Sequence, residues 1–417
     1  MTKPCIAGLT VLTALSSPGL AQSASGQSLQ QQVETLQQQV SALTAQSQEQ
    51  SRWLTIGGRL QLDATLFDGA YNAENQGATG STIFPRRARL SASGERQDLE
   101  YKMILEFADE TAEILLLRFE YSGFENGPVI KLGKIREDIS LDALTSSKHM
   151  ALIERSALAN TLSPYFRWGI SASQYYPGSG LRYALGIYKN DAFGSQGTDE
   201  NSALSLATTG RLTYSHSPDE HSVIHIGGWG SYQKMDHSVL NESFARGEIR
   251  EPQTRLVNYA LPLTPEAMDS LSQYGIEAAY QYKSLVVQSE YAMRSVSTSD
   301  SASSLDGEHY QGYYLLASYM LTGEVKSYST GSARFNQPRG VADAWEVAAR
   351  ISSMDATSAF QGTRSHSLTL GVSYYIDADT KIMLNGVRSR VTGPGTAALV
   401  GDHSDGNALT IRFHYDF

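Results

Sequence analysis

Cysteine and long apolar runs are both nearly absent from this sequence. The one cysteine, Cys5, lies in a leader that we expect to be removed, which excludes a disulfide framework and a cysteine-ligated metal site. No window of about 18 apolar residues occurs after position 21, which excludes a membrane-spanning helix. Charged residues make up only 18% of the 417 positions, and the net charge is −10. This acidic balance excludes generic nucleic-acid binding.

Motifs of known enzymes are missing as well. The nine histidines are scattered, and no H-E-x-x-H, G-x-S-x-G or P-loop motif occurs. His221 and His225 are four residues apart, which on a strand separates them by about 13 Å, too far to chelate one metal. We therefore predict no catalytic residue, no metal site and no cofactor. A barrel lipase with a Ser/His pair on its outer wall stays an alternative that no motif supports.

The first 21 residues have the pattern of a secretory signal peptide. Lys3 supplies the positive start, an apolar stretch follows, Pro18 breaks it, and small residues precede the expected cleavage after Ala21. The mature chain would then begin near Gln22.

Residues 22–51 show a short heptad pattern. Apolar residues follow one another at intervals of 4, 3, 4 and 3, which is an a/d seam of a coiled coil. Two to three heptads are marginal on their own, so a solvated, partly helical linker is the alternative. The seam consists of Leu29, Val33, Leu36, Val40 and Leu43.

After this segment, apolar and polar residues alternate with a period of two. In the final run, Leu409, Ile411, Phe413, Tyr415 and Phe417 alternate with polar residues. This period indicates strands with one apolar and one polar face. Many runs reach roughly 8 to 13 residues, which is longer than most globular strands and long enough to cross a bilayer at a tilt.

The connections between the runs alternate in length. Short turns such as Ser217-Pro218-Asp219 separate long polar loops such as 137–165. This is typical of a barrel with short periplasmic turns and long outer loops. If Glu324–Thr330 is a strand, the number of strands is about 17. An odd number does not suit a closed antiparallel barrel whose two chain termini lie on the same side of the membrane. If 322–343 is instead a long periplasmic connection, the count is about 16.

The long loop 234–273 contains one helix signal. Thr264 and Pro265 are the residue types preferred at a helix N-cap and first helical position, which predicts a short helix reaching Leu271.

A membrane barrel explains this pattern better than a soluble sandwich. Closure removes exposed strand edges, and lipid outside with water inside suits strands that have one apolar face. The apolar dyad that ends at Phe417 is typical of the C-terminal signal of bacterial outer-membrane proteins. We predict an all-β fold, a transmembrane antiparallel β-barrel over 52–417, exported through the periplasm to the bacterial outer membrane. The mean hydropathy of −0.29 agrees, because half of each strand is polar.

Four stretches resemble the phosphate-selective porin O/P family. The first is Arg86-Arg87-Ala88-Arg89-Leu90, and the second, most specific one runs over 132–156 with Thr145-Ser146-Ser147 and Glu154-Arg155-Ser156. The third lies within 321–350, and the fourth is the final strand. The resemblance covers roughly residues 50–417.

The resemblance implies a homotrimeric channel whose third outer loop, here 137–165, folds into the lumen and narrows it. It also implies basic residues along the pore that conduct small anions, because guanidinium groups match phosphate oxygens and rings of positive charge select anions. The predicted pore and anion-binding residues are Arg86, Arg87, Arg89, Arg118, Lys131, Lys134, Arg136 and Arg155, with Arg59 on the pore wall.

The alternation indicates which face of the second strand these arginines occupy. Ala88 and Leu90 belong to the apolar face, so Arg87 and Arg89 point inward. Arg86 lies at the outer end, where it can also turn to the mouth. No acidic residue lies within five positions of this cluster.

One position departs from the family pattern. Phosphate-selective members carry a lysine after the Leu-acidic pair of the loop, and here Ala143 follows Leu141-Asp142. With Arg136, the loop has three basic residues against four acidic ones. The solute therefore stays open between small anions and general or cation-tolerant diffusion, and a non-conducting structural envelope barrel is a third possibility. The predicted partners are outer-membrane lipid, lipopolysaccharide and small anions.

Overall fold

The computed structural model describes most of the chain after position 52. The described residues are 34–35, 53–108, 111–164, 166–189, 206–234, 244–245, 248–251, 255–258, 268–300, 306–360 and 362–417. The predicted signal peptide and almost all of the predicted coiled-coil segment 22–51 lie outside these residues, and so does position 165.

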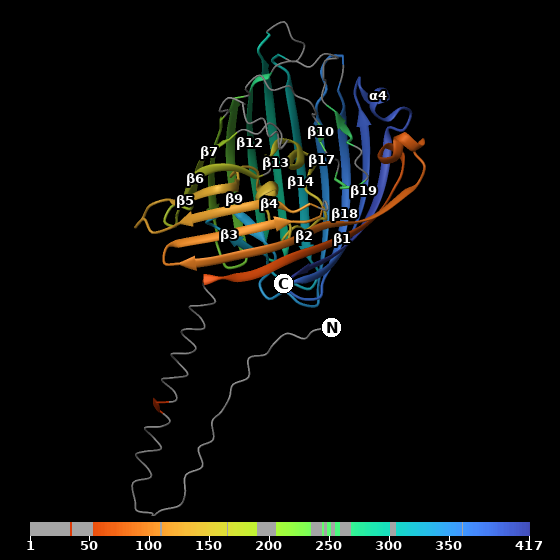
Figure 1. Ribbon diagram of the computed structural model, residues 1–417. Coiled ribbons are helices and arrows are strands. Elements are labelled where there is room, and N and C mark those ends of the chain that lie inside the picture. The colour runs from red at the N-terminus through yellow and green to blue at the C-terminus, as the bar shows by residue number, and fades with distance from the viewer. Residues whose placement is uncertain are drawn as a thin grey trace, which may run out of the picture. The chain divides into compact units, whose positions relative to one another are not determined.

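Among the described residues, sixteen strands form one closed antiparallel barrel (Figure 1). β20 pairs with β1, with Tyr415 opposite Leu60, and this pairing closes the barrel. In order around the barrel, the strands are β1 (Thr55–Phe67), β2 (Gly80–Arg96), β3 (Leu99–Glu106), β4 (Glu113–Tyr121), β5 (Val129–Arg136), β6 (Phe166–Tyr176), β7 (Leu181–Lys189), β8 (Leu206–His216), β9 (Ser222–Lys234), β12 (Met268–Tyr282), β13 (Leu285–Thr298), β14 (His309–Met320), β17 (Ala344–Asp355), β18 (Arg364–Tyr375), β19 (Thr380–Thr392) and β20 (Asp405–Asp416).

The remaining elements are short and lie in connections. Two small sheets pair β10 (Phe244–Ala245) with β11 (Val257–Asn258), and β15 (Ser327–Ser329) with β16 (Arg334–Asn336). None of the described helices is long and apolar enough to cross a membrane. These helices are η1 (Gly69–Asn75), α2 (Leu141–Leu144), α3 (Ala157–Leu162) and α4 (Thr396–Val400).

Apolar side chains of the strands point outward, and the polar ones that alternate with them point into the barrel. On β20, Ile411 and Phe413 are 47% and 45% exposed, whereas Arg412 and His414 are 1% and 2% exposed. A water-soluble protein would bury the first pair, and a barrel in lipid exposes it because lipid replaces the core. The predicted transmembrane arrangement of the final strand is confirmed.

The predicted strand count is also confirmed. The segment 322–343 contributes no strand to the barrel, and β15 and β16 within it pair only with each other. This segment follows β14 at the end of the barrel that carries the short turns and Phe417. We call this end the turn end and the opposite end the loop end.

The predicted helix at 264–271 is wrong over its described part. Residues 268–271 belong to β12, where Leu271 is registered with Gln233 of β9 and Val296 of β13. The capping residues Thr264 and Pro265 lie outside the described residues. Pairing with two neighbouring strands outweighs a local helix signal of a few residues, because an isolated short helix is unstable.

A register shift on β2 redirects one arginine. Gln61 faces Arg87 while the next residue of β1, Leu62, faces Pro85, so Arg86 is the extra residue of a bulge. Proline lacks an N–H group and is confined to edges and bulges of sheets, so Pro85 suits this position. The bulge turns the Arg86 side chain into the lumen, where it meets Glu154.

Candidate functional site

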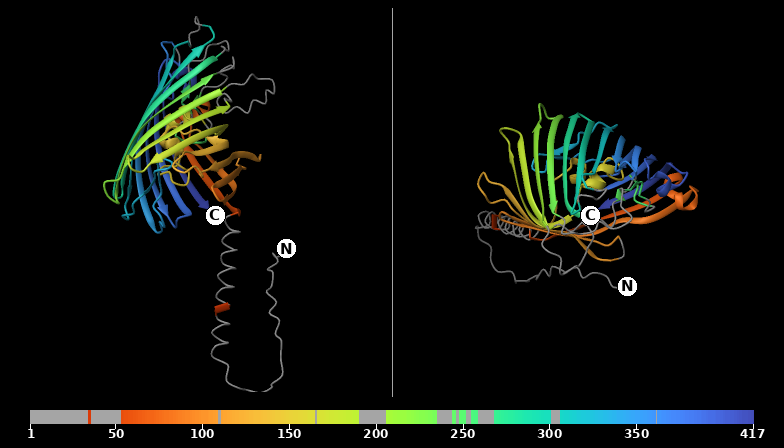
Figure 2. Two further views of the ribbon diagram at one scale, coloured as in Figure 1. Left: turned by 90° about the vertical axis from the view of Figure 1, so that its left-hand side faces the viewer. Right: turned by 90° about the horizontal axis from the view of Figure 1, so that it is seen from above.

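Residues 137–164, which we call the loop insert, lie inside the barrel. The right-hand view of Figure 2 shows the short helices of this yellow segment within the ring of strands. Ile139, Leu158 and Leu162 pack in one buried cluster with Trp229 of β9 and other inward residues of the wall. An apolar face on the insert and an apolar patch on the wall bury each other, which fixes the insert to one side of the lumen.

Acidic residues of the loop insert anchor it to arginines of the barrel wall. Glu137 accepts a hydrogen bond of 2.7 Å from Arg167 on β6. Asp138 lies 2.5 Å from Arg182 on β7 and 3.0 Å from Arg211 on β8. Burial alone would raise the pKa of Asp138, but the charges of Arg182 and Arg211 outweigh burial and hold it below its usual range.

The far end of the loop insert is anchored in the same way. Glu154 lies 2.6 Å from Arg86 on β2 and 2.9 Å from Arg412 on β20. These two charges outweigh the effect of burial and hold the pKa of Glu154 well below its usual range. Three of the four acids of the insert thus neutralise wall arginines, so the acidic composition of the loop does not describe the charge that a solute meets.

Arginines also gather around the C-terminal end of α2. Arg136 donates to the carbonyl of Ala143, and Arg155 donates to the carbonyls of Asp142 and Thr145 at 3.0 and 2.5 Å. Arg334 of β16 donates to the carbonyl of Leu144 at 2.5 Å. Carbonyl groups at a helix C-terminus lack partners within the helix and carry partial negative charge, so they hold guanidinium groups well.

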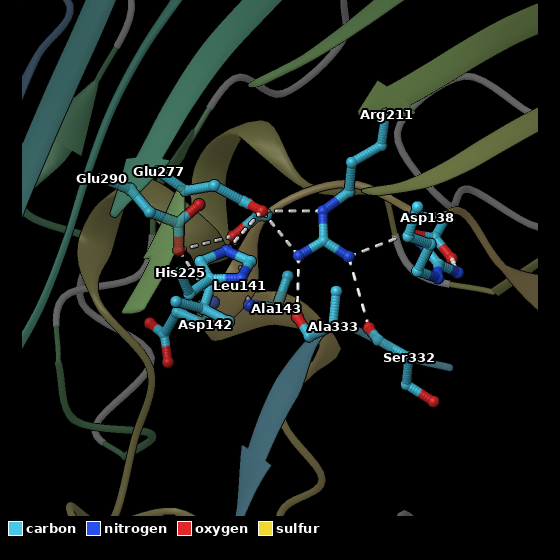
Figure 3. Close-up of polar contacts among 12 residues, drawn as sticks. Asp138, Leu141, Asp142, Ala143, Arg211, His225, Glu277, Glu290, Ser332 and Ala333 are labelled. Carbon is cyan, nitrogen blue, oxygen red and sulfur yellow. Dashed lines mark hydrogen bonds and ion pairs between the residues drawn. The ribbon is translucent and has the colours of Figure 1, made fainter. Parts of the chain in front are cut away.

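Residues 322–343, which we call the hairpin insert, meet the loop insert inside the lumen. Besides the Arg334 contact, Arg211 donates to the carbonyls of Ser332 and Ala333, at 3.3 and 2.9 Å. Figure 3 shows the Arg211 guanidinium between Glu277, Asp138 and these two carbonyls. Arg211 therefore joins β8, β12, the loop insert and the hairpin insert in one buried network.

The open part of the lumen borders β2 to β5. Arg89, Arg118 and Lys131 point inward there and keep 12%, 23% and 24% of their side chains exposed. The inward arginines on the wall that the inserts cover, such as Arg182 and Arg412, are each 1% exposed. The inserts fill one side of the barrel, and the inward cations of the other side stay partly exposed.

A group of like charges spans this open part. Lys102 on β3 is acted on by the charges of Arg118, Arg59 and Arg334, and by Glu100. The pKa of Arg334 is lowered by burial and, against the opposing charge of Asp138, by Arg118 and other arginines. Lys102 and Arg118 are also registered opposite each other on β3 and β4, so two cations of this wall stand side by side on its inner face.

Each predicted pore residue that points inward also has a partner. Arg59 pairs with Asp416 at 2.6 Å and donates to Ser147, and Arg89 pairs with Glu106 at 2.6 Å. Arg87 is buried and donates to Gln61. Arg89 has no acid near it in the sequence, yet the neighbouring strand supplies one.

The acids of the β4 region pair with the two remaining wall cations. Arg118 contacts Glu100 on β3 and lies 3.2 Å from Glu120, while Lys131 lies 4.0 Å from Glu120.

The prediction of Lys134 as a pore residue is wrong. Lys134 is registered with Leu117 of β4 and Trp168 of β6, and Trp168 is 47% exposed on the outer wall. Its ammonium group lies 3.6 Å from Glu113 and donates to the carbonyl of Ile114. The period of two that puts Lys131 inside puts Lys134 on the opposite face, whereas the resemblance had grouped it with the pore residues.

Sequence reasoning missed several lumen residues. Lys102 could have been found, because it alternates with Met103 and Tyr101 on a short strand. Arg334 could not, because its segment was interpreted only as a connection. Arg167, Arg182, Arg211 and Arg412 had the right alternation but no nearby signal of their acidic partners, which are distant in sequence.

Comparison with known proteins supports this architecture. A model of the family described as phosphate-selective porin O and P matches residues 54–417. The chain belongs to this family. Porin O of Pseudomonas aeruginosa is 25% identical to this porin, over 87% of this chain and 88% of that protein.

Solved porin structures share the fold. An anion-selective porin from Comamonas acidovorans has a TM-score of 0.53 at 12% identity, and covers 87% of this chain with 99% of its own. The trimer form of OmpT from Vibrio cholerae has a TM-score of 0.53 at 11% identity, with the same coverage. This porin is therefore a barrel of the bacterial outer membrane, and family and fold point to a channel rather than an enzyme.

Proposed function

We propose that this porin conducts small anions, including phosphate-like solutes, by passive diffusion between the β2–β5 wall and the two inserts. The observation that carries the proposal is the pair of Lys102 and Arg118, which are registered opposite each other on β3 and β4 and face the open lumen, with the Arg118 side chain 23% exposed. Cations that are held in place before a solute arrives stabilise an anion without further reorganisation. Arg59, Arg89 and Lys131 extend the same wall above and below.

The family resemblance leads us to expect a lysine at position 143, where this chain has alanine. The guanidinium groups of Arg136, Arg155 and Arg334 all bind carbonyls of residues 142–145 around that position. Positive charge around position 143 would then come from three arginines rather than from one lysine.

Ion selectivity in planar bilayers tests the proposal. In a potassium chloride gradient, we expect a reversal potential of the anion-preferring sign, and a clear shift toward zero in Arg118→Ala and Arg334→Ala. Lys134→Ala is the matched control, because it removes the same charge from the outer wall and should leave the reversal potential unchanged. A channel that prefers potassium, or no channel at all, would overturn the proposal. Competition by phosphate and sulfate would rank the solutes.

A general or cation-tolerant pore is the second candidate. It is favoured by the carboxylates of Glu100, Glu106 and Glu120, which share the partly exposed wall with the cations. Under this alternative the Arg118→Ala variant changes the reversal potential little, and small organic solutes of either charge permeate at similar rates.

We further propose the homotrimer and the assignment of residues 22–51 as a periplasmic coiled coil after a cleaved signal peptide. The heptads and the family resemblance support both. Cross-linking and native mass spectrometry of the full chain would test the trimer. A structural envelope barrel would differ from a porin by showing no conductance, together with an envelope defect when residues 27–50 are deleted.

A further inference from the structure

Two arginines stand on the outer wall of the barrel near its loop end. Arg388 and Arg390 occupy successive outward positions on β19, and both are exposed. Arg388 is registered between Leu368 of β18 and Asn407 of β20, and Arg390 between His366 and Asp405. In Figure 1, β19 leads from the turn end, marked by the C-terminus, up to α4 at the loop end.

The two arginines lie at the upper edge of the apolar band. On β20, the outward residues from Tyr415 to Leu409 are apolar and exposed. Asn407 and Asp405 follow, eight and ten residues from Tyr415. At about 3.3 Å per residue and a tilt of about 40°, these residues lie roughly 20 and 25 Å above Tyr415. The apolar band of such barrels is about 25 Å tall, so Arg388 and Arg390 reach the level of lipid headgroups.

Other strands place different residues at this level. Near the loop end, β6, β9 and β12 present Trp168, Tyr232 and Tyr274 to the outside, each about half exposed. Aromatic side chains are the usual occupants of a membrane interface. The two arginines on β19 interrupt this belt of aromatic residues. Their chemistry differs from that of aromatic side chains, because guanidinium groups bind phosphate through paired hydrogen bonds.

The outer arginines are also poorly neutralised compared with those of the lumen. Arg388 is 73% exposed and reaches Asp405 only at 4.0 Å. Arg390 forms no ion pair with any residue in the described part of the chain. Lumen arginines such as Arg211 and Arg412 instead lie within about 3 Å of buried carboxylates. The lumen arginines are buried and already bound to carboxylates, so they have few hydrogen-bond donors left for a ligand. Arg388 and Arg390 are exposed, and most of their donors remain available.

The surroundings limit what can bind. Arg364, on the same face, is paired with Asp355, and the carboxylate of Asp68 is already bound by Asn407. Asp405 is the carboxylate that a bound anion would have to displace from Arg388. Below the arginines, Leu368, Leu370 and Leu409 offer an exposed apolar surface suited to acyl chains. An anion with attached hydrocarbon would satisfy both parts of this surface at once.

We propose that Arg388 and Arg390 form a binding site for the phosphorylated headgroup of lipid A, the lipid moiety of lipopolysaccharide, on the outer face of β18–β20. The site faces the outer leaflet, because it lies at the end opposite the short turns and Phe417. The phosphates bind the two guanidinium groups, and the acyl chains lie along the leucines below. This role is independent of the pore, since the two side chains point away from the lumen.

Binding of purified lipid A to the full-length porin in detergent tests the proposal. In native mass spectrometry or a fluorescence titration, the double variant R388A/R390A should bind lipid A about tenfold or more weakly than the parent protein. The charge-preserving variant R388K/R390K should lose less affinity for lipid A, because lysine keeps the positive charge but lacks the paired N–H donors of a guanidinium group. The matched control is Lys189→Ala together with Lys234→Ala, which removes two exposed cations from β7 and β9 and should leave binding unchanged.

Two further measurements separate the alternatives. Dephosphorylated lipid A should bind the parent protein as weakly as phosphorylated lipid A binds R388A/R390A, and equal binding of both lipids by the parent would overturn the proposal. If R388A/R390A lost its oligomeric state while keeping lipid A affinity, the surface would be a contact with a second copy, and the proposal would be wrong. Unchanged single-channel conductance in R388A/R390A shows that the barrel is folded.

Discussion

The Glu154 carboxylate of the loop insert lies 2.9 Å from the Arg412 guanidinium of β20, across 258 residues of sequence. This contact ties the insert to the strand that closes the barrel. It also shows how the lumen uses its charges, because an arginine that would attract solutes is occupied by an acid of the loop. In the proposed function, the cations left for conduction are those on the uncovered wall.

Replacing Glu154 by glutamine should loosen the loop insert. The change removes the carboxylate that Arg86 and Arg412 share, while Arg412 keeps Asp63 at 2.6 Å, and breaking a buried pair costs about 3–5 kcal/mol. We expect a larger and noisier single-channel conductance in bilayers. Glu220→Gln is the control, since Glu220 lies in the turn between β8 and β9 and its side chain is 85% exposed. An E154Q channel with the parent conductance would show that the insert is held by its apolar contacts alone.

Introducing lysine at Ala143 should destabilise the porin rather than improve its anion preference. Ala143 is 1% exposed, and its carbonyl already binds Arg136, so a lysine would be buried beside a guanidinium group. We expect A143K to unfold at a lower temperature on heated gels, while A143S stays near the parent. Higher anion selectivity without loss of stability would contradict the placement of this residue.

Acidification should leave the channel unchanged until the pH falls far below neutrality. Asp138 and Glu154 have folded-state pKa values below their usual range, so they stabilise the insert above the unfolded pKa and lose this effect only as the pH falls through the folded pKa. Burial and nearby cations such as Lys381 lower the pKa of His149 to about 3, so it does not titrate near neutrality. Conductance recorded from pH 7 down to about 3 should be flat above pH 4 and change below it. A step near pH 6 would point to another group.

Alanine at Gly133 should impair the barrel. Gly133 has φ of +127°, and an added Cβ would lie 2.0 Å from the backbone carbonyl oxygen of Leu117. Such a clash with backbone destabilises by more than about 1 kcal/mol. Gly386→Ala is the matched control, because no atom lies within 4 Å of its added Cβ. The midpoint of urea unfolding in detergent should fall for G133A and stay constant for G386A.

The orientation of individual side chains was predictable wherever the period of two is regular. Arg87 and Arg89 point inward as the alternation with Leu90 indicates, and the final strand exposes Ile411 and Phe413. Irregular positions were not predictable in the same way. Arg86 reaches Glu154 because a bulge adds a residue, and the predicted helix over 264–271 gave way to ladder pairing at Leu271.

The sequence by itself determined the barrel, its strand order and the outward apolar face, because these follow from a local repeat that every strand carries. Only the tertiary structure decided which cations remain available to a solute, because ion pairs depend on distance in space. Glu137, Asp138 and Glu154 read as an acidic loop, yet each neutralises an arginine of the wall. Arg334 was interpreted as part of a connection, yet the fold brings its guanidinium group to the carbonyl of Leu144 in the loop insert.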